Sequence, residues 1–175
     1  NTNLGILLLC APLIQAVYRM TPTQNLRDAL NDVLNHTTVE DAEWVFRAIT
    51  LASPGGLGES SDQDVHSRPV VTLQQAMVLA AERDRIALQY TNAFKDIFDF
   101  AVLAYNRAFV LSGERGWATL MVFATMLSRY PDSHIERKYG KQYSEWIATE
   151  MRSLCEHMTI FDGFDRLLPR LYALD

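Results

Sequence analysis

Apolar residues recur at helical spacing along most of this chain, and the longest such run covers residues 73–111. Apolar positions three and four residues apart define one face of a helix. In the second half of the run, apolar residues spread around the whole circumference, which is typical of a helix inside a protein. The run therefore predicts a long buried central helix, with a break near Asp84 and an end at residues 112–113.

A polar stripe follows the same run. Carboxylates are costly to bury unless they are paired or bind a cation, and Asp99 lies in a strongly apolar segment, so we expect it to be buried. Two interpretations stay open: polar chemistry that faces the interior, or a partly exposed first half whose stripe is solvated. The stripe consists of Arg85, Gln89, Asn92, Asp96, Asp99 and Asn106.

Shorter helices are predicted on both sides of this run. Residues 4–19 read as a buried core helix that contains Pro12, Thr23 is the expected cap of a helix that ends at Asn35, and Thr38 opens a helix to about Ala52. A long loop follows over residues 53–71, and Thr72 is expected to cap the central helix in a capping box with Gln75. Later helices are expected over residues 117–130, 133–139, 141–158 and 164–174. The apolar face of the helix at 141–158 is expected to consist of Tyr143, Trp146, Ile147, Met151 and Leu154. No strand alternation or internal repeat is present. The predicted fold is all-α: a single-domain multi-helix bundle over residues 1–175, built around the long central helix.

Composition narrows the class of protein. The net charge is −5 with no basic cluster, which argues against nucleic-acid binding. The apolar run near the start is too short to span a membrane. Cys10 and Cys155 have no metal-ligand spacing; a disulfide stays open, but a reduced cytoplasmic protein is favoured. Because the chain opens without Met, we expect it to be the larger, C-terminal part of a longer chain.

Polar residues concentrate at three places. Asn1, Thr2 and Asn3 begin a helix, where free backbone N–H groups suit a phosphate; a plain helix cap is the simpler interpretation. The glycine-rich segment 54–58 precedes several acidic residues but lacks the Lys-Ser/Thr of a phosphate-binding P-loop. It is either a lid or an ordinary surface loop.

The third place is the segment 130–140. Asp132 and Glu136 lie four residues apart, so a helix that starts there presents both carboxylates to one cation. Arg137 and Lys138 suit phosphate contacts. A capped, charged surface helix is the alternative interpretation. His134 is more often structural than catalytic as a lone histidine, and no nucleophile–base or zinc pattern is present.

Four stretches together resemble a known family. They are Asn1-Thr2-Asn3-Leu4-Gly5, Pro54-Gly55-Gly56-Leu57-Gly58 with Asp64-Val65, Glu82-Arg83-Asp84 with Gln89-Tyr90, and Pro131-Asp132-Ser133 with Arg137-Lys138-Tyr139-Gly140. In this order they resemble a divergent branch of the triphosphoribosyl-dephospho-CoA synthase family. The family's N-terminal Lys-Pro-Gly-Asn-like motif is absent here, and its later Asp-Thr-Asn and His-Arg-Gly-Gly motifs are altered, so the choice of substrate stays open.

The resemblance implies a reaction. The family transfers the triphosphoribosyl group of ATP to a ribose hydroxyl of dephospho-CoA and releases adenine, which resembles glycoside hydrolysis in its logic. Partners would be ATP and a CoA-like or other cofactor-precursor acceptor, and a homo-oligomer is compatible with the sequence. A non-catalytic helical domain that binds nucleotides, other ligands or proteins is the alternative.

The resemblance also implies roles for individual residues. Mg²⁺ would accompany ATP, held by one or two carboxylates and the phosphates. The implied catalytic residues are Asp84, Asp96 and Asp99, and the implied metal ligands are Asp132 and Glu136. The implied nucleotide-binding residues are Asn1, Thr2, Asn3, Gly55, Gly56, Arg83, Arg137 and Lys138.

Overall fold

The computed structural model describes residues 3–52, 65–157, 169 and 172. The described residues form helices joined by turns, with no strand among them, so the all-α fold class is confirmed. The chain divides into two compact units, Asn1–Lys95 and Asp96–Asp175. The extent of a single domain over residues 1–175 stays a prediction.

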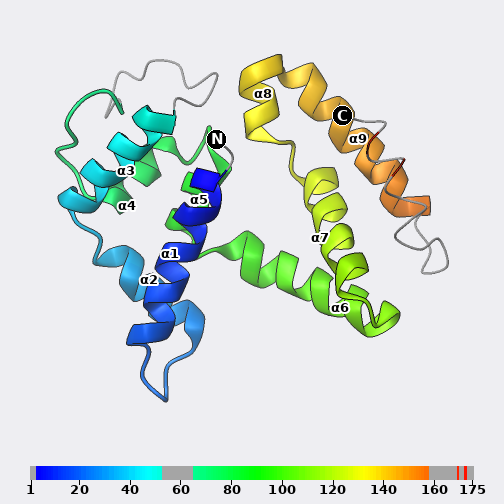
Figure 1. The fold of residues 1–175 in the computed structure, drawn as a ribbon, viewed down its shortest axis with the longest axis horizontal. Helices are drawn as coiled ribbons and strands as arrows, with labels where there is room; N and C mark the ends of the chain where they lie inside the picture. Colours follow the sequence, from blue (N-terminus) through cyan, green and yellow to red (C-terminus); the bar gives the residue numbers. More distant parts are fainter. Residues whose placement is uncertain (1–2, 53–64, 158–168, 170–171, 173–175) are drawn as a thin grey trace. The chain divides into compact units, whose positions relative to one another are not determined.

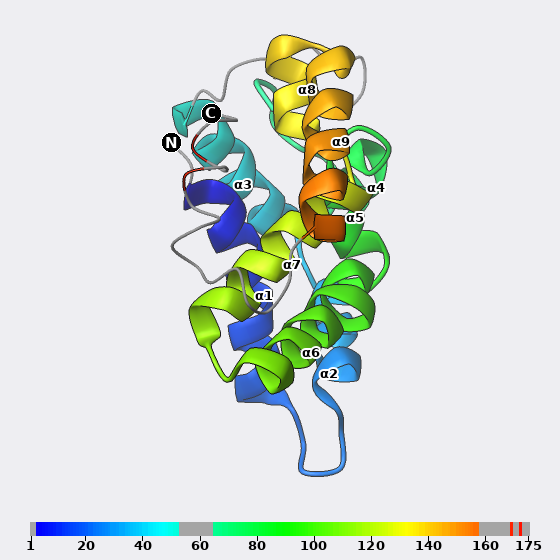
Figure 2. The ribbon, with the colours of Figure 1, turned by 90° about the vertical axis from the view of Figure 1, so that its right-hand side faces the viewer.

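The first unit is built from helices that pack mostly on their neighbours in sequence. Helix α1 lies beside α2, and α4 contacts both α3 and α5 (Figures 1 and 2). Their bounds are α1 Asn3–Arg19, α2 Leu26–Asn35, α3 Val39–Ala52, α4 Leu73–Ala80 and α5 Arg85–Thr91. The buried apolar residues of this unit include Ala16, Leu30, Leu34, Phe46, Leu73, Met77, Ala87, Tyr90 and Phe94.

Side-chain caps set the starts of these helices. Thr38 and Asp41 cap α3 reciprocally, since the Asp41 N–H donates to Thr38 Oγ1 at 3.1 Å and the Thr38 N–H to Asp41 Oδ2 at 2.7 Å. Thr72 forms the predicted capping box at the start of α4. The expected cap at Thr23 is wrong: Asn25 caps α2 by accepting from the Asp28 N–H at 2.9 Å. Asn is a strong N-cap residue, and Asn25 directly precedes Leu26, the first residue of α2.

The prediction that α1 is a buried core helix is also wrong. Within the helix only Pro12 and Ala16 are buried. Ile6, Leu7, Ile14 and Val17 are all more than half exposed. Within its unit, α1 packs on α2, α3 and α5 over part of its circumference, so the remaining apolar side chains have no neighbour to cover them there.

The predicted central helix is divided into several pieces. It breaks at residues 81–84, near Asp84 as expected, and again at residues 92–94. The second unit then begins with a short π-helix, η1, at Ile97–Ala101, followed by α6 at Val102–Ser112. Gly113 ends α6 in the left-handed conformation, with φ of 71°. Only Ala108 of α6 is buried, and Val110 is 82% exposed, so the prediction of burial around the whole helix was wrong.

The second break is a strained turn. Ala93 and Phe94 have φ of 50° and 56°, a region that costs residues other than glycine about 1–2 kcal/mol each. Arg27 of α2 holds the turn by donating to the carbonyl of Ala93 at 3.2 Å and to that of Asn92 at 3.4 Å. The Phe94 ring is fully buried, and its burial contributes on the order of 2 kcal/mol, enough to offset much of the strain.

The second unit continues with α7 at Arg115–Arg129, α8 at Ser133–Tyr139 and α9 at Lys141–His157. Helix α7 packs on both α6 and α9, and α8 packs on α9 (Figures 1 and 2). Gly140, with φ of 103°, separates α8 from α9 as predicted. The core of this unit consists of Ala108, Trp117, Ala118, Leu120, Ala124, Met151 and Leu154.

One expected face of α9 is partly wrong. Met151 and Leu154 are buried as predicted, but Tyr143 and Trp146 are about half exposed. Ser144 and Ala148 take the inner positions instead, because small side chains let α9 approach the neighbouring helices closely. The predicted last helix, residues 164–174, lies almost entirely outside the described residues.

Two further sequence features can be placed. In the part of the chain that the structure describes, no helix combines the length and the apolar character needed to cross a membrane. Cys10 and Cys155 are both free thiols. Burial raises the pKa of the Cys155 thiol, although a hydrogen bond with Ser128 lowers it, so this thiol is a poor nucleophile near neutral pH.

Candidate functional site

The predicted site residues fall into three groups. Asn1, Thr2, Gly55 and Gly56 lie outside the described residues, as do the acidic residues expected beside the glycine-rich loop. Asn3, Arg83 and Asp84 belong to the first unit. The second unit contains Asp96, Asp99, Asp132, Glu136, Arg137 and Lys138.

In the first unit, the starts of α1 and α5 lie side by side. The Tyr90 hydroxyl of α5 donates to the Leu8 carbonyl of α1 at 2.6 Å, and one turn earlier Gly5 faces Ile86. The two helices therefore run parallel with adjacent N-termini, as the position of the α1 start beside α5 in Figure 1 also shows. Adjacent helix N-termini concentrate partial positive charge, and Asn3 lies at this place.

Gly5 has a physical reason to be glycine. A Cβ at this position would lie 2.7 Å from Ile86 Cδ1, so the end of the Ile86 side chain would have to shift. The glycine of the Asn-Thr-x-x-Gly pattern thus permits the close approach of α1 to α5 that brings the two helix starts together.

A larger residue at position 5 should separate these helices. We expect Gly5→Leu to lower the free energy of unfolding by about 1–3 kcal/mol, the usual cost of overpacking. Ile86→Ala in the same chain should recover part of the loss, because it removes the side chain that clashes. Urea unfolding measures both changes, and Ala11→Leu, at an exposed position of α1, is the control. Equal melting of Gly5→Leu and Ala11→Leu would contradict the close approach.

Asp84 and Arg83 lie at this same place. Asp84 Oδ1 accepts from the N–H groups of Ile86 at 2.8 Å and Ala87 at 3.1 Å, so Asp84 caps α5. Its negative charge also compensates the partial positive charge at the starts of α1 and α5. Arg83 is exposed in the turn just before the cap. The structure thus gives Asp84 a structural task, and its catalytic role stays a prediction.

In the second unit, η1 packs against the end of α7. The rings of Phe100 and Tyr130 meet edge to face with centres 6.0 Å apart, and the Arg129 guanidinium lies over the Phe100 ring at 4.7 Å. This contact brings the π-helix that carries Asp99 next to the segment that leads into Asp132. π-Helical turns and strained turns are frequent at functional sites, and here a π-helix directly follows the strained turn.

The start of α8 is organised as the sequence predicted. Asp132 Oδ1 caps the helix by accepting from the Ile135 N–H at 3.1 Å. Glu136 is exposed one turn later, and its N–H donates to the Asp132 carbonyl at 2.9 Å. Arg137 is half-buried, and the Lys138 ammonium lies over the Tyr139 ring at 4.9 Å. Two carboxylates and two cations are therefore grouped within two helical turns.

The carboxylates do not form a complete metal site by themselves. Within the described residues, no three His, Cys, Asp or Glu side chains converge as metal ligands. Mg²⁺ does not require such a group, because it commonly takes one or two carboxylates and completes its shell with phosphate oxygens and water. Asp132 and Glu136 fit this partial role.

The expected burial of Asp96 and Asp99 holds for only one of them. Asp96 is 8% exposed, whereas Asp99 is exposed. The sequence placed both on one helical stripe, but the π-helix changes the angular spacing between residues 96 and 99, and Asp99 turns away from the apolar side chains around it.

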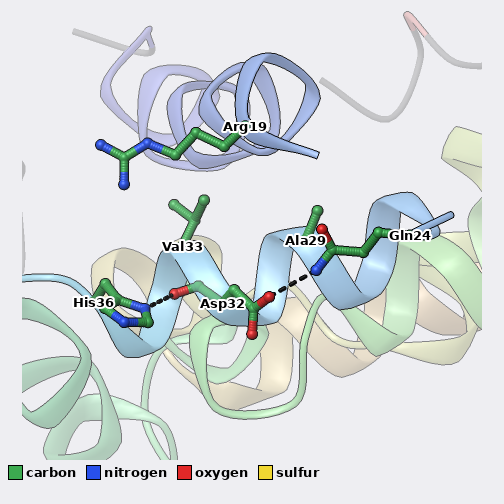
Figure 3. A pocket seen from close by; sticks show the side chains of 6 residues that line it. All are labelled: Arg19, Gln24, Ala29, Asp32, Val33 and His36. Atoms are coloured by element: carbon green, nitrogen blue, oxygen red, sulfur yellow. Dashed lines mark hydrogen bonds between the residues drawn. The ribbon is translucent and has the colours of Figure 1, made fainter. Parts of the chain in front are cut away.

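A small pocket in the first unit was not found from the sequence. It has a volume of about 200 Å³ between the end of α1 and α2, as Figure 3 shows. Gln24 donates to Asp32 Oδ2 at 2.6 Å, and His36 Nδ1 lies 2.7 Å from the Asp32 carbonyl. The residues that line the pocket come from two helices and the turn between them, so no sequence motif indicates the pocket. Ligand pockets usually have volumes of about 300–1,000 Å³, and this pocket is smaller. Its lining residues are Arg19, Gln24, Ala29, Asp32, Val33 and His36.

Helix starts in one unit, and cations in the other, are groups that can bind phosphate in proteins. A comparison with protein families gives a more specific result. The family model of the ATP:dephospho-CoA triphosphoribosyl transferases (CitG) matches residues 1–175. The chain belongs to this family of transferases, which act in cofactor biosynthesis. Comparisons with curated proteins and with solved structures give no match.

Proposed function

We propose that this protein transfers the triphosphoribosyl group of ATP to dephospho-CoA, or to a related cofactor precursor, and releases adenine. Family membership over the whole chain carries this proposal. The described residues supply groups that such a reaction needs: cations for the phosphates and carboxylates for proton transfer and metal binding.

The bond that breaks joins adenine to C1′ of the ribose, and the bond that forms joins C1′ to the acceptor hydroxyl oxygen. The sugar passes through an oxocarbenium-like state, as in glycoside hydrolysis. The hydroxyl proton leaves to a carboxylate, and Asp99 suits this role because it is exposed to solvent on the π-helix. Asp96 is the buried alternative. The departing adenine takes up a proton.

Phosphate binding is assigned to polar and basic groups in both units. Asn3 and Arg83 lie at the adjacent starts of α1 and α5, and Arg137 and Lys138 lie in the last turn of α8. Asp132 and Glu136 would hold Mg²⁺ together with phosphate oxygens. Bound Mg²⁺ would neutralise charge on the triphosphate. Asp132 would then have two tasks, since it also caps α8.

The product of ATP turnover tests the proposal. We expect adenine to form in amounts equal to the ATP consumed, in the presence of dephospho-CoA, with no ADP or AMP. The reason is that the family reaction breaks the glycosidic bond and leaves the three phosphates joined. Chromatography of the nucleotides, with heat-inactivated protein as the control, gives the result. Release of ADP or phosphate without adenine would rule out this reaction, while ATP binding with no product would favour the non-catalytic alternative.

A further inference from the structure

A positively charged side chain lies on an aromatic platform in the second unit. Arg129 is exposed at the end of α7, and its guanidinium carbon lies 4.7 Å from the centre of the Phe100 ring and 5.3 Å from that of Tyr130. The two rings meet edge to face at 76°. Cations within about 6 Å of a ring centre are attracted to it. The platform therefore restrains a side chain that would otherwise sample many rotamers.

The donors of this guanidinium remain available. Within the described part of the chain, Arg129 contacts the two rings, and none of the hydrogen bonds or ion pairs found there involves its side chain. Both ring contacts are made at the guanidinium carbon, whereas the five N–H groups of a guanidinium point outward in its plane. A restrained planar fork of donors matches two oxygens of a phosphate group.

Charges around the platform suggest how a phosphate would be bound. Asp99 directly precedes Phe100, and Asp132 lies two residues beyond Tyr130. Negative charge on either carboxylate would repel a nearby phosphate unless a divalent cation neutralises it. Binding at Arg129 should therefore be stronger in the presence of Mg²⁺.

We propose that Arg129, held by Phe100 and Tyr130, binds a phosphate group of the triphosphate as a bidentate donor. This inference rests on the proposed function for the identity of the ligand, but the geometry of the platform stands without it. It adds to the phosphate-binding set a residue that the sequence analysis did not select, because only the packing of η1 on α7 brings Phe100 to Arg129.

The test uses calorimetric titration of the full chain with ATP and, separately, with inorganic tripolyphosphate, each with Mg²⁺. We expect Arg129→Gln to weaken both affinities by roughly tenfold or more, the value of a charge-assisted hydrogen bond. Arg129→Lys should reduce the logarithm of each affinity by about half as much as Arg129→Gln, because lysine keeps the charge but lacks the planar set of donors. Arg115→Gln, at the opposite end of the same helix, removes the same charge and should change affinity less than twofold.

A second variant tests the platform. Phe100→Leu keeps an apolar side chain but removes the ring, and should weaken tripolyphosphate binding by roughly threefold to fivefold, in line with a cation–π contact at an exposed site. Thermal melting of each variant without ligand verifies that the fold is intact. Weaker binding by the Arg129 and Phe100 variants, with unchanged binding by Arg115→Gln, supports the proposal.

The other outcomes separate the two claims. If the wild type binds both ligands and Arg129→Gln binds them equally well, the role of Arg129 is wrong while the proposed function stands. If tripolyphosphate binds in an Arg129-dependent way but ATP does not, Arg129 is a phosphate-binding residue and the proposed function fails. If neither ligand binds the wild type, both are wrong.

Discussion

Replacing Tyr90 with Phe is expected to lower the free energy of unfolding by about 1–3 kcal/mol, the cost of an unsatisfied polar group. In a regular helix, the Leu8 carbonyl would accept from the N–H of residue 12. Residue 12 is Pro, which has no N–H. The Tyr90 hydroxyl fills this vacancy by donating to the Leu8 carbonyl at 2.6 Å. Removing the hydroxyl therefore leaves the carbonyl without its replacement donor. Urea unfolding at neutral pH measures the loss.

A double-mutant cycle with Pro12→Ala tests this explanation. The alanine restores an N–H at position 12 that can donate to Leu8 within α1. We therefore expect Tyr90→Phe to cost less than about 0.5 kcal/mol in the Pro12→Ala background, an interaction between the two positions of the size seen for residues in direct contact. An equal cost in both backgrounds would show that the Tyr90 hydroxyl does not replace the missing N–H of residue 12.

The same hydroxyl gives an alkaline pH dependence. Burial, together with the charge of Asp41, raises the pKa of Tyr90 to about 12, against about 10 in an unfolded chain. Because the folded-state pKa is the higher one, the contribution of Tyr90 is complete below pH 10 and is lost as the pH rises toward 12. The difference in stability between the wild type and Tyr90→Phe should therefore shrink over this interval.

Asp99→Asn is expected to reduce turnover by about 10²- to 10⁴-fold, the usual contribution of a general base. This expectation rests on the proposed function. The variant should melt normally, because surface substitutions usually change stability by no more than about 0.5 kcal/mol and Asp99 is exposed. Adenine release measures the first effect, and thermal melting measures the second.

Two comparisons make this experiment specific. Glu114→Gln removes an exposed carboxylate of the same unit and should leave turnover unchanged. Asp96→Asn tests the buried alternative. Full activity of Asp99→Asn, with activity lost in Asp96→Asn, would assign the base to Asp96. A large drop in the melting temperature of Asp99→Asn with activity intact would instead show a structural role.

Features that depend on local chemistry could be predicted from the sequence. Thr38, Thr72 and Asp132 cap the helices expected of them, because the donor and acceptor in each cap lie three residues apart. Gly113 and Gly140 end helices in conformations that glycine readily adopts. The all-α class, the break at Asp84 and the order of the helices follow from the same short-range signals.

The exposure of helix faces could not be predicted in this way. Apolar residues around α6 and along α1 suggested burial, yet many of them are exposed. Periodicity identifies which residues share a face, whereas burial depends on which elements pack on that face. The grouping of candidate site residues has the same limit: Phe100 meets Tyr130 and Gly5 meets Ile86 across long sequence separations, and no pattern along the chain encodes these contacts.

The turn at residues 92–94 shows most directly what the sequence determined and what the tertiary structure decided. By itself, the sequence determined a helical, apolar run with a polar stripe. It gave no reason to place Ala93 and Phe94 in the left-handed region, which both residues disfavour. Only the tertiary structure decides this, because full burial of Phe94 and two hydrogen bonds from Arg27 offset the local strain. The turn ends the helical run before the π-helix.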